Sequence, residues 1–333
     1  MDLATLLALG ALSIESLTAD INNLPFTPTR IGDMKLFQES GIDTTVALVG
    51  INGDTLTLVP NVPRGAPSQP KALSPKNAKA FLVPHLPQRS TVMADSLQGA
   101  RSFGLNGSSE PEAAATRITA LNVLHRRDLD FTIEYHRLGA VKGIILDASG
   151  DTIYDLYTEF GVAQPTQAMA LGTDATKVRT NVMAAKRKIE VALGGVRPAG
   201  FHAFVGSSFM DKLVDHPNVI KAYERWAEGA KLRSDNRSGF EFAGVVFEEY
   251  EGSYGGAQLV ATDEGYLFPI GVPGMFITRY APADYIETVN TLGLPYYSKT
   301  QAMDFNKGVM LESQSNPLNL NTRPGAVVKL TTN

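Results

Sequence analysis

The chain has 333 residues, of which 44% are hydrophobic and 19% are charged, and its formal net charge is −4. A chain of this length can bury a large core and is expected to form about two domains. The sequence contains no cysteine, which excludes disulfides, thiolate metal sites and cysteine catalysis. Its negative charge argues against binding a polyanion by overall electrostatic attraction.

The first residues predict an amphipathic arm. An aspartate at position 2 and the lack of any basic residue before Arg30 argue against a secretory signal. The apolar run is also too short and too interrupted to span a bilayer. We expect the arm to dock either on a neighbouring subunit or on its own core. The residues that can share its apolar helical face are Leu3, Leu6, Leu7, Ile14 and Leu17.

Residues 43–92 predict a long two-stranded excursion. The β-branched composition of 43–60 favours a strand, and 79–92 is strand-like again. Between them, 61–76 is rich in proline and has almost no large apolar residues, so it cannot build a core. A lone hairpin is marginal in water and must lie on something, either its own domain or a neighbour. The prolines of the tip are Pro63, Pro67, Pro70 and Pro75.

Residues 109–142 give the strongest helix signal. Ser109 followed by Glu112 is a capping-box pattern, and Pro111 is tolerated in the first turn. A helix over 110–142 would be about 50 Å long, which suggests a spine in an elongated subunit. The apolar positions at helical spacing are Ile118, Leu121, Leu124, Phe131, Tyr135, Leu138 and Val141.

A β-hairpin and a second helix are predicted next. Residues 143–157 hold two apolar runs around the turn sequence 148–151. Residues 174–193 predict a helix that Asp174 caps and Gly194 and Gly195 end. The predicted apolar face of this helix consists of Val178, Val182, Ala185 and Ile189.

The remaining sequence reads as a second, mixed α+β module. Short strands are expected to alternate with short helices, followed by strands near the C-terminus. The expected strands are 201–205, 240–250, 266–270, 275–280, 307–318 and 326–332, and the expected helices are 207–214 and 219–228.

A search for catalytic or metal-binding motifs is negative. The five histidines lack the helical spacing of metal ligands, so we interpret them as surface or internally satisfied side chains. Ser207 and Ser208 follow a strand and open a helix, but the glycine of a nucleophile elbow is missing, which favours a helix cap. The histidines are His85, His125, His136, His202 and His216.

Phosphate, cation and nucleic-acid motifs are equally weak. Residues 252–256 are glycine-rich but lack the lysine and hydroxyl residue of a phosphate loop. Asp147, Asp151 and Asp155 alternate along the predicted hairpin and are expected to stabilise turns. The basic clusters 186–188 and 126–127 favour a solvated face or a subunit contact. We therefore assign no catalytic, cofactor-binding or metal-binding residues and expect a structural role.

The order of these elements resembles the Hong Kong 97-type capsid fold of tailed bacteriophages, and more closely the phage lambda-like (E-type) major capsid protein family. The resemblance covers nearly the whole chain. It rests on the order of the stretches 54–59 and 81–87 around the proline-rich tip, 141–157, 282–286, 308–318 and 324–330.

The resemblance implies an α+β fold with an N-terminal arm, an extended E-loop hairpin, a peripheral domain with the spine helix, and a mixed axial domain. The implied boundaries are 1–38 for the arm, 39–95 for the E-loop, 96–200 with 300–333 for the peripheral domain, and 201–299 for the axial domain.

The implied protein is a major head protein, not an enzyme, and needs no cofactor. It would form hexamers and pentamers of an icosahedral virion shell that encloses double-stranded DNA, held non-specifically on the inner face. It would assemble in the host cytoplasm, with no membrane involved. Scaffold, portal, a maturation protease and a decoration protein are the implied partners. The alternatives are an encapsulin-like nanocompartment shell protein, an α+β enzyme with an unrecognised site, or a tail or adaptor protein.

Overall fold

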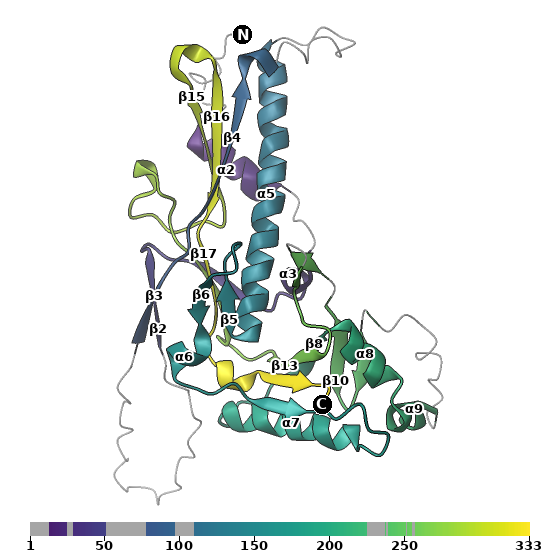
Figure 1. Ribbon diagram of the computed structural model, residues 1–333. Coiled ribbons are helices and arrows are strands. Elements are labelled where there is room, and N and C mark those ends of the chain that lie inside the picture. Colours follow the sequence, from purple (N-terminus) through teal and green to yellow (C-terminus); the bar gives the residue numbers. More distant parts are fainter. Residues whose placement is uncertain are drawn as a thin grey trace, which may run out of the picture. The chain divides into compact units, whose positions relative to one another are not determined.

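The computed structural model describes residues 13–24, 29–50, 78–96, 110–224, 237, 239–250, 252–254 and 257–333. These residues belong to two compact units (Figure 1). Unit 1 comprises Met1–Leu48, Ala80–Glu134 and Ile277–Asn319, and unit 2 comprises Val49–Lys79, Tyr135–Phe276 and Leu320–Asn333. The long helix α5 (Glu110–Lys142) contributes residues to both units.

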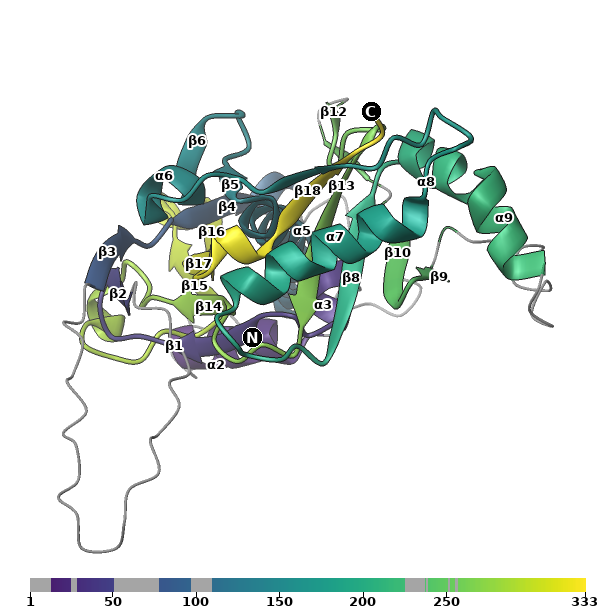
Figure 2. The same cartoon turned by 90° about the horizontal axis from the view of Figure 1, so that it is seen from below.

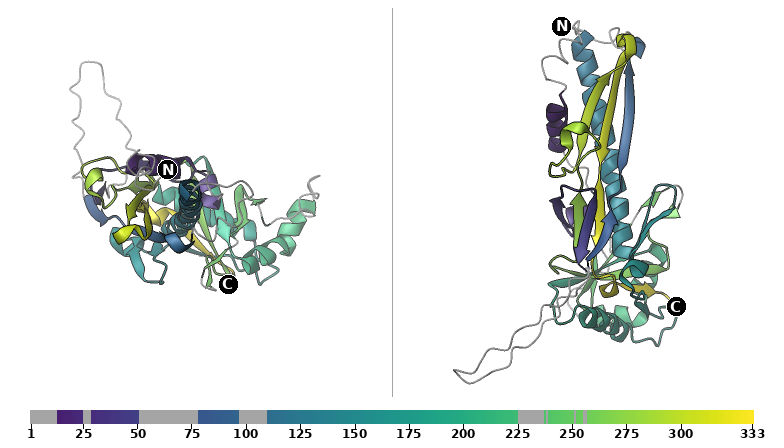
Figure 3. Two further views of the ribbon diagram at one scale, coloured as in Figure 1. Left: turned by 90° about the horizontal axis from the view of Figure 1, so that it is seen from above. Right: turned by 90° about the vertical axis from the view of Figure 1, so that its left-hand side faces the viewer.

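Unit 1 is built on a three-stranded antiparallel sheet. Its strands are β15 (Tyr297–Ala302), β16 (Gly308–Ser315) and β4 (Leu86–Met93), with β16 in the middle. The helix α2 (Ile14–Asn23) packs against β15, and α5 runs along the sheet (Figure 3). One core cluster joins both helices to β4 and β16, and consists of Leu17, Val92, Ile118, Val309 and Leu311, with Leu121 packed against it.

Smaller elements complete unit 1. The strand β1 (Gln38–Gly41) pairs in parallel with β14 (Phe276–Tyr280), which also pairs with β17 (Pro317–Asn321). A short helix, α3 (Arg30–Asp33), precedes β1. The strands β2 (Val46–Gly50) and β3 (Ala78–Leu82) form a two-stranded sheet at the residues that flank 51–77.

Unit 2 contains a six-stranded mixed sheet in the order β7-β18-β13-β8-β10-β9. The helix α7 (Val178–Ala192) packs on this sheet at β7, β13 and β18, and α8 (Ser207–Val214) packs on β10 (Figure 2). The helix α9 (Pro217–Glu224) follows α8. The strands are β7 (Thr166–Ala168), β8 (Gly200–Val205), β9 (Phe240–Phe242), β10 (Val245–Glu249), β13 (Glu264–Ile270) and β18 (Val328–Thr331).

The remaining elements of unit 2 are small. The strands β5 (Ile144–Leu146) and β6 (Thr152–Asp155) form an antiparallel hairpin that leads into the helix α6 (Leu156–Phe160). A two-residue hairpin joins β11 (Ser253–Tyr254) to β12 (Ala257–Gln258). The 3-10 turn Pro324–Ala326 precedes β18, whereas the 3-10 turns Ile286–Thr288 and Asp304–Asn306 belong to unit 1.

Several predicted elements are confirmed. The spine helix spans 110–142 as expected, and the hairpin over 143–157 forms, although its last residues belong to α6. All four residues predicted to form the apolar face of α7 are buried, and Gly194 and Gly195 end the helix with positive φ. The helix begins at Val178 rather than at 174, because 173–177 form turns and Lys177 holds the cap position.

The predicted apolar face of α5 is partly wrong. Ile118, Leu138 and Val141 are buried, but Leu124 and Phe131 are exposed. Polar side chains occupy the buried side in their place, because the facing strands present hydroxyl and aromatic partners to them. These buried polar residues of α5 are Asn122, His125, Arg126, Asp130, Glu134, His136 and Arg137.

The predicted excursion over 43–92 is confirmed in part. The strands β2 and β3 pair, but β4 leaves the pair and joins β16 instead. Pro84 lies between β3 and β4, where the chain changes partner. The proline-rich tip 61–76, the strand prediction for 51–60, the Ser109 cap and the arm residues Leu3, Leu6 and Leu7 lie outside the described residues.

The C-terminal strand β18 joins the six-stranded sheet of unit 2. It pairs with β13, with Gly265 opposite Leu330. Strand pairing over such separations depends on tertiary packing and leaves no local signal in the sequence.

Candidate assembly surfaces

The residues singled out for chemistry have structural roles. Among the described residues, no group of three or more His, Asp or Glu side chains could hold a metal ion, and no helix is long and apolar enough to cross a membrane. Asp147 accepts hydrogen bonds from the backbone of Ser149 and Asp151, and Asp155 caps α6. The turn-stabilising roles predicted for Asp147 and Asp155 are therefore confirmed.

The predicted serine cap of α8 is wrong. Gly206 holds the cap position, and no side chain caps the helix. A Cβ atom at Gly206 would lie 2.1 Å from the carbonyl oxygen of Ala261, so the backbone approach requires glycine there. Ser207 is the first residue of the helix and is not presented as a nucleophile on a strained turn.

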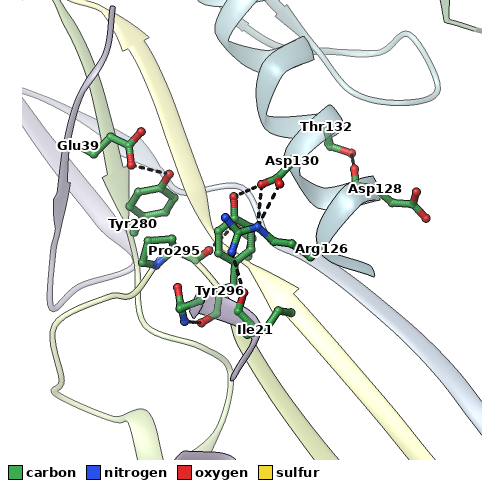
Figure 4. Close-up of polar contacts among 11 residues, drawn as sticks. Ile21, Glu39, Arg126, Asp128, Asp130, Thr132, Tyr280, Pro295 and Tyr296 are labelled. Atoms are coloured by element: carbon green, nitrogen blue, oxygen red, sulfur yellow. Dashed lines mark hydrogen bonds and ion pairs between the residues drawn. The ribbon is translucent and has the colours of Figure 1, made fainter. Parts of the chain in front are cut away.

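A buried ion pair on α5 anchors unit 1 (Figure 4). The guanidinium of Arg126 donates to both carboxylate oxygens of Asp130, at 3.0 and 3.1 Å, and to the carbonyl oxygen of Ile21 at 2.7 Å. Its Cζ also lies 3.7 Å from the ring centroid of Tyr296, whose hydroxyl donates to Asp130. The solvated face predicted for 126–127 is therefore wrong for Arg126, and burial beside Asp130 raises the pKa of the Tyr296 hydroxyl.

A second polar cluster continues along the same side of α5. His125 bridges two strands, with its Nε2 2.7 Å from the Ser90 hydroxyl and its Nδ1 2.9 Å from the Ser313 hydroxyl. Ser313 and Ser298 both donate to the side-chain oxygen of Asn122. Burial lowers the pKa of His125, so its ring stays neutral near pH 7. The prediction of an internally satisfied histidine is confirmed at this position.

The helices α2 and α3 attach to the same framework through polar contacts. Glu134 accepts from the backbone N–H of Ile31 at 2.6 Å and of Gly32 at 3.3 Å, at the start of α3. The side chain of Asn22 on α2 donates to the carbonyl oxygen of Tyr296 at 2.9 Å. Because buried polar groups cost free energy unless they are paired, this set of partners favours one arrangement of the helices on the sheet.

The framework of unit 1 presents a loop, 281–296, with apolar side chains pointing outward. Ile286 is 91% exposed, and Val289 and Leu292 are also exposed. Two polar contacts fix the loop to the three-stranded sheet. Lys299 of β15 pairs with Glu287 at 2.7 Å, and the Tyr285 hydroxyl donates to Glu312 of β16 at 3.3 Å. Burial raises the pKa of Tyr285 to about 12. The loop therefore displays apolar surface in a fixed conformation.

Three further places in unit 1 expose large apolar side chains. On the β2–β3 pair, Leu48 is 74% and Leu82 is 62% exposed. On α5, Leu124 and Phe131 face outward. At the turn between β15 and β16, Phe305 is 92% exposed. Scattered exposed apolar residues are common, but concentrations of them in fixed elements mark contact surfaces.

A groove of about 620 Å³ runs beside α2 in unit 1. Residues of α2 line one part of it, and residues 287–294 with Tyr297 line the other. Its lining is mostly apolar, with the carboxylates of Glu15 and Glu287 among the polar groups. The lining residues are Ile14, Glu15, Thr18, Ala19, Asn22, Asn23, Glu287, Thr288, Thr291, Leu292, Leu294 and Tyr297.

Comparison with known proteins identifies the type of subunit that carries these surfaces. Residues 13–332 match the family described as phage major capsid protein E. The chain belongs to this family. The resemblance found in the sequence is thereby confirmed, and the exposed apolar elements are those of a major capsid protein of a phage shell.

Relatives of this capsid protein cover nearly its whole length. The major capsid protein of Salmonella phage Felix O1 (isolate Felix O1-VT1) is 24% identical over an alignment of 354 positions that covers 95% of each chain. The major capsid protein of Pseudomonas phage KPP10 is 27% identical over 293 residues, covering 82% of this chain and 83% of the relative.

Solved structures confirm the predicted α+β, Hong Kong 97-like fold. The putative capsid protein of a prophage of E. coli CFT073 has a TM-score of 0.58 at 14% identity, over 96% of this chain and 99% of that one. A phage-related protein from Bordetella bronchiseptica RB50 has a TM-score of 0.53 at 11% identity, over 95% and 96% of the two chains.

Proposed function

We propose that this capsid protein is a purely structural subunit that closes an icosahedral shell from hexamers and pentamers around double-stranded DNA. The observation that carries the proposal is the placement of exposed apolar side chains on several separate elements of unit 1, including the β2–β3 pair, the loop 281–296 and the β15–β16 turn. A shell requires each subunit to contact different neighbours through different surfaces, unlike a simple dimer.

The unit boundaries agree in part with the proposed domains. Unit 1 contains 96–134 and 300–319 of the proposed peripheral domain, and unit 2 contains 201–276 of the proposed axial domain. Unit 2 also takes in 135–200 and 320–333, and unit 1 takes in 277–299. The strands β2 and β3 form the base of the proposed E-loop, and the exposed Leu48 and Leu82 place apolar contacts there.

The proposed partners beyond the subunit itself are a scaffold, a portal, a maturation protease, a decoration protein and DNA held non-specifically on the inner face. Assembly is proposed to take place in the host cytoplasm, before the subunit becomes part of the virion. Contacts to DNA phosphates carry no sequence information, so non-specific holding needs no base-reading surface.

The test is electron microscopy of the full chain expressed alone. Closed shells or tubes are the expected product. A preparation that stays monomeric or dimeric at high concentration, and that shows a catalytic activity, would contradict the proposal.

A further inference from the structure

The turn between β15 and β16 holds an aromatic residue in an unfavourable backbone conformation. Phe305 has φ 57 and Asn306 has φ 52, so two consecutive non-glycine residues lie in the left-handed region. A bulky residue is strained there relative to the right-handed conformation, because its Cβ crowds the following carbonyl oxygen. Glycine would relieve the strain, yet the turn carries phenylalanine with 92% of it exposed.

Within the described part of the subunit, the Phe305 side chain is not buried, so its packing does not offset the backbone strain. The Nζ of Lys307 lies 5.5 Å from the ring centroid of Phe305, an exposed cation–π contact of small energy. Backbone strain of this kind persists where it serves recognition. A fixed, exposed aromatic ring at the end of a stiff hairpin has the properties of an interface anchor, because such rings dominate binding energy once a pocket covers them.

Unit 1 also contains a receptor of suitable size and chemistry in the groove beside α2. A phenylalanine side chain buries about 150–250 Å² when it is enclosed, and a groove of about 620 Å³ with Leu292, Leu294 and Tyr297 in its lining accommodates it. One charge also matches. The groove carries the carboxylate of Glu15, which is opposite in sign to Lys307 of the turn, whereas Glu287 already pairs with Lys299.

The turn cannot fill the groove of its own subunit. Tyr297 lines the groove and is also the first residue of β15, whose other end leads into the turn. At about 3.3 Å per residue, the strand carries Phe305 roughly 25 Å away from Tyr297. A β15–β16 turn that fills this groove therefore belongs to another copy. Two different surfaces of one chain then meet, which is the head-to-tail type of contact that builds rings and shells.

We infer that the β15–β16 turn of one subunit, with Phe305 as anchor, docks in the groove between α2 and the loop 287–294 of a second copy. The inference deepens the proposed shell-forming function and rests on it. It assigns to a specific pair of surfaces one of the contacts that assembly requires.

Because the chain contains no cysteine, introduced cysteines report on this contact directly. The full chain is made as Asn306→Cys, which keeps Phe305, and separately as Ala19→Cys in the groove. The two variants are co-assembled and treated with a short bis-maleimide, and the products are separated under denaturing conditions. We expect covalent dimers in the mixture and none from Asn306→Cys combined with Arg187→Cys, an exposed residue of unit 2.

A second measurement uses Phe305→Ala and the matched surface change Val191→Ala, at an exposed residue of α7. Phe305→Ala is expected to raise the protein concentration needed for assembly at least tenfold, with an unchanged unfolding midpoint of the isolated subunit. Val191→Ala should leave both unchanged. Closed particles that form without cross-links, with Phe305→Ala assembling normally, would overturn the inference while leaving the proposed function intact.

Two other outcomes are equally decisive. If Ala19→Cys cross-links to Leu6→Cys and not to Asn306→Cys, the groove binds the N-terminal segment, and the inference is overturned. A wild-type chain that never exceeds a monomer would contradict the inference together with the proposed function.

Discussion

Arg126 and Tyr296 lie face to face in unit 1, although 170 positions separate them in the chain, with the guanidinium carbon 3.7 Å from the ring centroid. Both also bind Asp130, whose side chain is almost fully buried. This three-residue contact ties the spine helix to the segment that leads into β15. Its energetic importance can be measured against the exposed ion pair next to it in the sequence.

Replacing Arg126 with alanine should destabilise the subunit by about 3–5 kcal/mol, because it leaves the buried carboxylate of Asp130 without its cation. The matched control is Arg127→Ala. Arg127 is 60% exposed and pairs with Asp128 at 3.4 Å, so its loss should cost at most about 1 kcal/mol. Denaturant unfolding of the isolated subunit measures both. If the two substitutions lower the free energy of unfolding equally, the buried contact stabilises the subunit no more than the exposed ion pair does.

We expect the folded subunit to lose stability at acidic pH because of His136. It is buried, and burial lowers its pKa to about 4, against the opposing effect of Asp147. Between pH 6.5 and 4 the unfolded chain binds a proton that the folded chain does not, so stability is full above pH 6.5 and falls as the pH drops toward 4. At 1.36 kcal/mol per pKa unit, the loss is about 3 kcal/mol.

His136→Gln should flatten this part of the pH profile, whereas His85→Gln should leave it unchanged. Unfolding free energies measured at intervals from pH 7 to 4 provide the comparison. A profile of His136→Gln as steep as that of the unsubstituted chain would assign the acid sensitivity to other groups, of which His125 is the first candidate because burial also lowers its pKa.

Gly143, which follows α5 directly, should tolerate no side chain. Its φ is +91, and a Cβ atom would lie 2.2 Å from the ring of Tyr157. Gly143→Ala therefore combines left-handed strain with overpacking, at about 3 kcal/mol in total. Gly150 has φ +90 with no atom within 4 Å, so Gly150→Ala should cost only about 1 kcal/mol. Thermal unfolding of the two variants separates the steric contribution from the conformational one.

Deleting Asn61–Lys76 should leave a soluble, folded subunit that does not close shells, because the segment has the composition of a reaching arm and not of a core. Electron microscopy and circular dichroism of the variant test assembly and folding separately. A companion variant, with the same segment replaced by glycine and serine at equal length, shows whether length alone suffices. Normal particles from the deletion would refute the assignment of this segment to a neighbour contact.

The sequence predicted the fold best where the signal is local. The apolar period of α7 and the turn residues of the β5–β6 hairpin depend on neighbouring residues, so their positions followed from the pattern. The buried side of α5 did not, because Arg126 reads as a surface residue, and the partners that bury it and His125 come from distant segments of the chain. The long-range pairing of β18 with β13 was missed for the same reason.

The sequence predicted that the chain has assembly surfaces but not which residues form them. The lack of a catalytic motif indicated a structural role, and the order of elements indicated the family. The strained turn at Phe305 left no signal, since phenylalanine and asparagine give no indication of a left-handed conformation unless the strand pairing around them is known. The groove beside α2 likewise depends on a loop that lies more than 260 positions away in the chain.

The position of β18 has a consequence for biosynthesis. This strand is the last of its sheet along the chain, yet it lies between β7 and β13 and not at an edge. A nascent chain that has emerged as far as β13 therefore has a gap in the sheet, and unit 2 can close only after translation of residues 328–331. The six-stranded sheet is thus completed only after synthesis of its most C-terminal strand, which delays the display of the folded surface of unit 2.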